Sequence, residues 1–377
     1  MTTDNRSTLF SPLTLPTPDG TGLKLRNRTI LSPMCQYAVE KMDGVATDWH
    51  LQHYGAIAAG GFGLLTIEST GVNPVGRISP LDLGMYSDEQ EAAHKHLVSF
   101  IHSQGAAAAV QLNHAGGRAS GEPWLPGVHG GSAPLEEGGW QTVGMTDESI
   151  AKDYRSTTKL DKDGISQIVS DFADAARRAD AAGYDAIQIH AAHGYLLHQA
   201  LSPLTNTRTD EYGGGLENRS RLMCEVVDAI RAVWPKSKPL GIRISATDWV
   251  EGGLDIETTA PLMRELVKHH GINWVDVSSG GLVNTPLQPS GPGFHAILGA
   301  QMKQALADTD AVVSVVGGIS SPEQAETMLR TRQVDAVSIG RAAMRNPHWP
   351  AMAAARLGVA REDIPASPQY WRADWDS

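Results

Sequence analysis

The chain has 377 residues, of which 41% are hydrophobic and 19% charged, and its formal net charge is −11. This composition is that of an ordinary globular protein, and the negative charge argues against a nucleic acid or an anionic membrane surface as partner, because both attract clustered Lys and Arg. The cysteines, Cys35 and Cys224, are too few for a disulfide framework, a four-cysteine zinc site or an iron–sulfur cluster.

Short apolar runs recur along the chain, and longer amphipathic stretches separate them. The runs predict eight strands, at Thr29–Met34, Gly63–Ser69, Ala106–Asn113, Tyr184–His190, Leu240–Ser245, Trp274–Ser278, Ala311–Val316 and Val334–Gly340. The stretches between them predict helices such as Asp88–Gln104, Ile165–Ala182, Leu216–Val233, Ile256–His270, Ala296–Ala307 and Pro322–Thr331. Because parallel strands need crossover helices, this alternation predicts a (β/α)8 TIM barrel. A doubly wound open sheet is the main rival, but residues 32–37 lack the glycine fingerprint that would follow its first strand.

We expect one barrel domain over residues 1–377, with two additions. Residues from about 114 to 164 form a Gly- and Pro-rich insertion that contains Trp124 and Trp140, and this predicts a lid over the barrel mouth. The tail, from about 359 to 377, carries Trp371 and Arg372. So much aromatic surface at a terminus should dock on the barrel or on a neighbouring subunit, which favours a homodimer or homotetramer. The absence of a signal-peptide core and of long apolar stretches predicts a cytoplasmic protein.

The most informative segment follows the fourth predicted strand, where His190, His193 and Tyr195 lie within six residues. Catalytic groups of barrel enzymes gather at the carboxyl ends of the strands. Two imidazoles can hold a substrate oxygen, and a nearby phenol can deliver a proton. The sharp alternative is a metal-dependent barrel hydrolase with His190, His193 and His114 as ligands, although a bridging carboxylate is not obvious. A purely structural role for both histidines is the weaker alternative.

A phosphate site is predicted at the last two strands. Gly317 and Gly318 follow the seventh strand, and Gly340 and Arg341 follow the eighth. Barrels often bind phosphate with these two loops, because backbone N–H groups of glycines come close to the anion and an arginine adds a fixed charge. The alternative is that the glycines form ordinary strand-to-helix turns.

Arg243 lies inside the fifth predicted strand, where an unpaired charge would be costly. It must therefore face a ligand or form a structural ion pair, for which Glu68 is a candidate. Gln111, in the third strand, also needs a ligand or another partner, although an uncharged amide costs less to bury than a charge. A flat heterocycle with carbonyls and ring nitrogens would satisfy both side chains.

These residues belong to motifs that resemble the old yellow enzyme family of FMN-dependent ene-reductases. The matching segments span essentially the whole chain from about Leu9 and are residues 32–37, Gln111 with 114–116, 190–197, 208–214, 216–219 and 339–341. Cys35 and the Trp-containing insertion are similar to the thermophilic-like branch, near the xenobiotic reductases. Relatives with an appended iron–sulfur domain are disfavoured by the small number of cysteines. A non-catalytic flavin-binding protein would not need the His–His–Tyr cluster.

The resemblance implies non-covalent FMN at the barrel mouth, with NADPH or NADH as reductant. The flavin phosphate would contact Gly317, Gly318, Gly340 and Arg341, and the ring would lie among Pro33, Met34, Cys35, Ser69, Gln111 and Arg243. The implied reaction reduces the activated C=C bond of α,β-unsaturated carbonyl compounds, with nitro compounds and nitrate esters as further acceptors. His190 and His193 would hold the substrate oxygen and Tyr195 would supply the proton. Tyr37 would help to position the substrate, and Trp371 and Arg372 would reach a neighbouring subunit's site.

Overall fold

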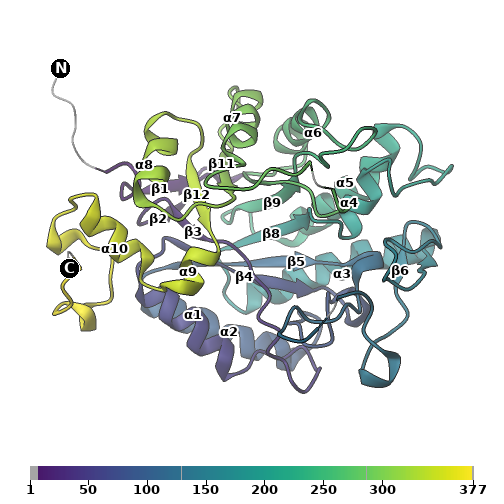
Figure 1. The fold of residues 1–377 in the computed structure, drawn as a ribbon, viewed down its shortest axis with the longest axis horizontal. Helices are drawn as coiled ribbons and strands as arrows, with labels where there is room; N and C mark the ends of the chain where they lie inside the picture. The colour runs from purple at the N-terminus through teal and green to yellow at the C-terminus, as the bar shows by residue number, and fades with distance from the viewer. Residues whose placement is uncertain (1–6, 129, 286, 376–377) are drawn as a thin grey trace.

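The computed structural model describes residues 7–128, 130–285 and 287–375. Its centre is a closed barrel of eight parallel strands in the order β10-β11-β12-β3-β4-β5-β8-β9, which confirms the predicted fold class (Figure 1). The barrel strands are β3 (Thr29–Leu31), β4 (Leu64–Gly71), β5 (Ala107–Asn113), β8 (Ala186–Ala191), β9 (Leu240–Ser245), β10 (Trp274–Ser278), β11 (Val312–Val316) and β12 (Ala336–Ile339).

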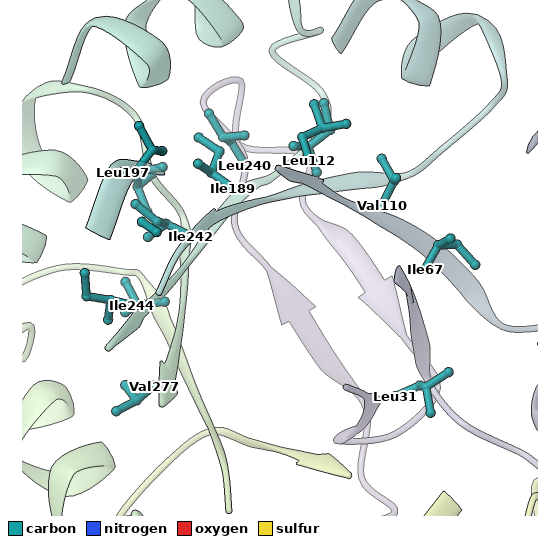
Figure 2. Close-up of a cluster of buried hydrophobic side chains, with 14 of the residues drawn as sticks. Leu31, Ile67, Val110, Leu112, Ile189, Leu197, Leu240, Ile242, Ile244 and Val277 are labelled. Carbon is teal, nitrogen blue, oxygen red and sulfur yellow. The ribbon is translucent and has the colours of Figure 1, made fainter. Parts of the chain in front are cut away.

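Helices surround the barrel and cover the outer face of its strands (Figure 1). They are α1 (Asp48–Ala59), α2 (Asp88–Ser103), α3 (Lys162–Ala181), α4 (Leu196–Leu201), α5 (Leu216–Val233), α6 (Ile256–His269), α7 (Ala296–Ala305), α8 (Pro322–Arg330), α9 (Arg341–Arg345) and α10 (Trp349–Arg356). Alternate apolar side chains of the strands, such as Val110, Ile189 and Ile242, point outward into the layer between strands and helices (Figure 2). Because both faces of each strand are covered, the strands are apolar runs rather than alternating ones.

The amino-terminal end of the barrel is closed by an antiparallel hairpin, β1 (Leu13–Leu15) with β2 (Leu23–Leu25), which is an addition to the predicted elements. Leu15 and Leu25 are buried in one cluster with inward residues of the barrel, among them Ile30 and Trp274. This plug leaves the carboxyl end of the strands as the end at which a ligand can enter. Helix α1 is a second addition to the predicted elements.

The predicted insertion is built of short pieces and precedes α3. It contains the 3-10 turns Gly116–Arg118 and Leu135–Glu137 and the two-stranded parallel sheet of β6 (Val143–Gly144) and β7 (Thr158–Lys159). Trp140 is held there by a hydrogen bond from its Nε1 to the Val75 oxygen (3.0 Å), whereas Trp124 is 84% exposed. That this segment acts as a lid stays a prediction.

The tail docks on its own chain, beside α10 and on the side of the molecule opposite the insertion (Figure 1). The Tyr370 ring packs against His348 with centroids 4.8 Å apart, and the Arg361 guanidinium lies 5.2 Å from the centre of the Trp371 ring. Among the described residues, no helix is long and apolar enough to cross a membrane.

Candidate active site

A cavity of about 670 Å³ opens at the carboxyl ends of the barrel strands. Its lining contains every residue predicted to bind flavin, namely Pro33, Met34, Cys35, Ser69, Gln111, Arg243, Gly317, Gly318, Gly340 and Arg341, together with Tyr37, His190, His193 and Tyr195. The volume lies in the range of cofactor sites. None of the described residues of 114–164 is in this lining, and neither is Trp371 or Arg372.

The three predicted catalytic side chains form one cluster at the end of β8. The His190 ring lies between the other two, with its centre 5.2 Å from that of His193 and 4.8 Å from that of Tyr195, and both contacts are edge-to-face. His193 has a φ of 57° and Gly194 a φ of 75°, so the chain turns sharply after the strand. A left-handed conformation at a residue other than glycine costs about 1–3 kcal/mol and persists only where its surroundings hold it.

Several hydrogen bonds hold this turn. The His193 N–H donates to Ser245 Oγ (3.0 Å), and the Gly194 N–H donates to His198 Nδ1 (3.0 Å). The other nitrogen of His198 lies 2.8 Å from the Asp248 carboxylate, and both side chains are fully buried. Since His198 accepts at Nδ1, its proton is on Nε2 and points at Asp248. The strain at His193 is therefore offset by buried polar side chains of β9, of α4 and of the loop that follows β9.

The site keeps its imidazoles neutral and its phenol protonated. Burial, with the charge of Arg243 second, lowers the pKa of both His190 and His193 well below the usual value. Burial raises the pKa of Tyr195. The Ala192 N–H points at His190 Nδ1 (3.3 Å), so the ring proton of His190 is on Nε2. His193 Nε2 lies 2.8 Å from Ser278 Oγ. The cluster thus offers neutral hydrogen-bond donors and one protonated hydroxyl.

Arg243 pairs with Asp276, not with Glu68, so the partner suggested for it from the sequence was wrong. The two residues are directly opposite each other on β9 and β10, and Arg243 Nε lies 3.4 Å from Asp276 Oδ2. The other oxygen of Asp276 accepts from Ser314 and Ser338. Within the described parts of the chain, Arg243 Nε has no hydrogen bond of normal geometry, so the pairing leaves the guanidinium able to bind a ligand.

The residues present fit a flavin. Gln111 donates from Nε2 to Gln188 Oε1 (2.8 Å) and lines the cavity near the same strand ends as Arg243. Polar side chains of this kind suit the pyrimidine edge of a flavin, and Pro33, Met34 and Cys35 provide a less polar wall. Gln188 Nε2 is buried and lacks a partner among the residues that the structure describes. Because Gln188 does not line the cavity, an ordered water rather than the flavin would satisfy this amide.

The glycines at the phosphate end meet a specific steric need. Gly318 has a φ of 65°, and a Cβ there would lie 2.1 Å from the Gly291 oxygen. Gly317 has a φ of 141° and would place a Cβ 2.7 Å from His295 Nδ1. The backbone can therefore take this course only with glycine, and it brings main-chain groups to the cavity wall beside Arg341.

The three pairs Arg243–Asp276, His193–Ser278 and His198–Asp248 were missed by the sequence reasoning. Asp276 could have been found, because a carboxylate in the middle of the apolar run 274–278 must be buried. His198 and Asp248 are far apart in the sequence and carry no such signal. In the described ranges, no group of three or more His, Cys, Asp or Glu side chains is arranged to hold a metal ion. His114 Nδ1 accepts from the Gly116 N–H (3.1 Å).

Comparison with known proteins places this geometry in context. Residues 8–358 match the model of the NADH:flavin oxidoreductase / NADH oxidase family. The chain is 42% identical to an NADPH dehydrogenase of Listeria welshimeri over 351 residues, which are 93% of this chain and 95% of the relative. It is 40% identical to an NADH:flavin oxidoreductase of Gibberella zeae, covering 95% of this chain and 87% of the relative. Among solved structures, morphinone reductase superposes with a TM-score of 0.75 at 29% identity and covers 96% of this chain and 92% of its own.

Proposed function

Because the chain belongs to the NADH:flavin oxidoreductase / NADH oxidase family, as an old yellow enzyme relative and an FMN-dependent NAD(P)H oxidoreductase, we propose that it reduces the activated C=C bond of α,β-unsaturated carbonyl compounds. Nitro compounds and nitrate esters, which also present a polarised oxygen, are further proposed acceptors. The observation that carries the proposal is the cluster of His190, His193 and Tyr195 in the wall of the barrel-mouth cavity.

FMN would be held non-covalently by the residues that line this cavity. Its phosphate would contact Gly317, Gly318, Gly340 and Arg341, and its ring would lie among Pro33, Met34, Cys35, Ser69, Gln111 and Arg243. The bound flavin supplies the hydride chemistry that connects the reduced nicotinamide to the acceptor. Arg243 keeps a positive charge at this place because Asp276 is opposite it.

The chain's own residues would bind, orient and protonate the substrate. His190 would donate from Nε2 to the substrate oxygen, and His193 would act as the second donor. Being neutral, they polarise the oxygen without introducing a competing charge, so the β-carbon becomes electrophilic. Burial raises the pKa of Tyr195, so its hydroxyl stays protonated and would donate its proton to the substrate α-carbon. Tyr37, in the same cavity, would position the substrate.

Substituting Tyr195 with Phe tests the proton-donor assignment. A positioned general acid contributes about 10²–10⁴-fold in rate, so we expect Tyr195→Phe to slow the oxidation of reduced enzyme by an enone to that extent. Reduction of the flavin by NADPH needs no proton from this side chain and should stay near the wild-type rate. The two half-reactions are measured separately by stopped-flow absorbance. Tyr212→Phe, whose hydroxyl contacts only Glu225 among the described residues, is the matched control. Equal losses in both half-reactions would refute the assignment.

The proposed oligomer rests on the tail. Trp371 is 58% exposed and Arg372 lies on the same tail, although the tail backbone is docked beside α10. We propose that these side chains reach the substrate site of a neighbouring copy in a homodimer or homotetramer. Arg372→Ala should then raise the KM for an enone while the sedimentation coefficient stays that of an oligomer. A monomeric wild-type protein would contradict this arrangement.

A further inference from the structure

Glu68 is a fully buried carboxylate immediately behind the cavity wall, and the mechanism above does not use it. It lies at a β-bulge: the register between β4 and β5 pairs Ile67 with Val110 and Ser69 with Gln111, so Glu68 is the extra residue. Bulges next to active sites re-aim side chains. Here the bulge lets Ser69 line the cavity and turns Glu68 outward, toward α1.

The carboxylate of Glu68 connects α1 to the segment Cys35–Tyr37. Glu68 Oε1 accepts from the Gln36 backbone N–H (2.9 Å), and Oε2 accepts from the Tyr54 hydroxyl (2.7 Å). The Tyr54 oxygen in turn accepts from the Glu68 N–H (2.9 Å). His50 Nε2 lies 3.7 Å from Oε1, and His50 is oriented because its Nδ1 accepts from the Thr47 N–H (3.0 Å). Hydrogen bonds to a charged acceptor are about twice as strong as neutral ones.

The Glu68 carboxylate restrains Gln36, which lies in the chain between the cavity residues Cys35 and Tyr37. Tyr37 has a φ of 52°, a conformation that costs free energy at a residue other than glycine. The neighbouring Gln36 N–H is fixed by Glu68, and the Gln36 side chain bonds back to the Met34 oxygen (2.8 Å). The Glu68 carboxylate therefore ties the strained turn that presents Cys35 and Tyr37 to β4, and a longer hydrogen bond from Trp49 Nε1 of α1 to Gln36 Oε1 (3.3 Å) supports the same turn.

We propose that Glu68 is a positioning residue, which holds the strained Cys35–Tyr37 turn and thereby sets the place of the Tyr37 side chain in the substrate site. The proposal rests on the proposed function in so far as Tyr37 is taken to contact substrate. Glu68 itself touches neither substrate nor flavin. It acts through the Gln36 backbone.

A second buried glutamate supplies the matched control. Glu326 accepts from the backbone N–H groups of Thr8 (2.8 Å) and Leu9 (2.9 Å) and so also ties down a loop, but it does not line the cavity. If loss of Glu68 acted only on overall stability, Glu326→Gln and Glu68→Gln would have the same effect on the site.

The test uses the FMN-loaded enzyme and measures enone turnover and the binding of phenol, whose oxygen would accept from His190 and His193 as the substrate oxygen does. Glu68→Gln removes the charge from the acceptor, and its N–H₂ group must face either the Gln36 N–H or the Tyr54 hydroxyl, so the bond to Gln36 becomes a weaker neutral one or is lost. We expect about a tenfold weaker affinity for phenol, followed by the flavin spectrum, and a similar rise in the KM for an enone with kcat less affected. Tyr54→Phe keeps the carboxylate but removes the hydroxyl that donates to Glu68 Oε2 and orients it, so it should show the same trend and serves if Glu68→Gln does not fold. Glu326→Gln should stay within about twofold of wild type.

A double-mutant cycle decides whether Glu68 acts through Tyr37. Phenol affinity is measured for Tyr37→Phe, Glu68→Gln and the double variant. If Glu68 positions Tyr37, the losses of phenol affinity in the two single variants are not additive. The double variant then binds phenol about as well as the single variant with the lower affinity. Additive losses, wild-type affinity in both Glu68→Gln and Tyr54→Phe, or an equal loss in Glu326→Gln would overturn the proposal. Because phenol binding is read without turnover, failure of the enone-reduction assignment would leave this result interpretable.

Discussion

The buried carboxyl of Asp82 leads to a specific prediction about how stability depends on pH, because it lies near the charge of Glu68. It is 1% exposed, and its Oδ2 accepts from the Ser79 N–H (2.7 Å). Its Oδ1 has no hydrogen-bond partner in the described part of the chain. Burial, and after it the charge of Glu68, raises the pKa of Asp82 from 3.8 to about 7. The perturbation is Asp82→Asn, which keeps an acceptor for Ser79 and removes the ionisable group.

The sign follows from proton counting. In the unfolded chain the Asp82 carboxyl ionises near its ordinary pKa, whereas in the folded protein it keeps its proton up to about pH 7. Between about pH 4 and pH 7 the folded state therefore binds more protons, and stability falls as the pH rises. A rise of the pKa from 3.8 to about 7 corresponds to about 4 kcal/mol. The Asn variant lacks this loss. Its buried amide adds a cost of about 1–3 kcal/mol that does not depend on pH.

The assay is urea unfolding of wild type and Asp82→Asn between pH 4 and pH 8, with the same excess of FMN in every sample. The difference in unfolding free energy between the two proteins should shift by up to about 4 kcal/mol in favour of the Asn variant across this range. Comparing two pH values cancels the constant cost of the amide. Asp147→Asn, in the exposed part of the insertion, controls for the loss of one surface charge. Parallel stability curves for wild type and Asp82→Asn would refute the reasoning.

Two further predictions concern the cavity wall. Ser278→Ala removes the hydroxyl that lies 2.8 Å from His193 Nε2. Phenol affinity should then fall about five- to tenfold, which is the contribution of one neutral hydrogen bond. Unchanged affinity in a spectroscopic titration would show that Ser278 does not orient the His193 ring. Gly318→Ala forces a Cβ to within 2.1 Å of the Gly291 oxygen at a φ of 65°, so FMN should dissociate faster on dilution. Gly358→Ala, with a φ of 71° and open space around its Cβ, should retain flavin as wild type does.

The barrel was predictable because its strands are covered on both faces and so stand out as apolar runs. The bounds of β9 and β10 agree with the predicted Leu240–Ser245 and Trp274–Ser278. The first barrel strand ends at Leu31, earlier than the predicted Met34, and Pro33 has no N–H with which to continue the ladder. The hairpin of β1 and β2 escaped prediction because three-residue strands are too short for a periodic signal.

The site shows where sequence reasoning stops and why. Residues at strand ends could be assigned to the barrel mouth, since the position of an end depends only on the position of its strand. Which side chains pair inside the barrel depends also on whether each residue faces inward or outward on its strand. Strict alternation along β4 would place Thr66 and Glu68 on the same inward face, where Glu68 could reach Arg243. The bulge between Ile67 and Ser69 shifts that alternation by one residue. Glu68 then faces Tyr54 outside the barrel, Ser69 takes the inward place, and Arg243 is left to Asp276 on the adjacent strand. One extra residue in one strand thus decides which carboxylate pairs with Arg243 and which supports the wall behind the cavity, and no apolar pattern records it.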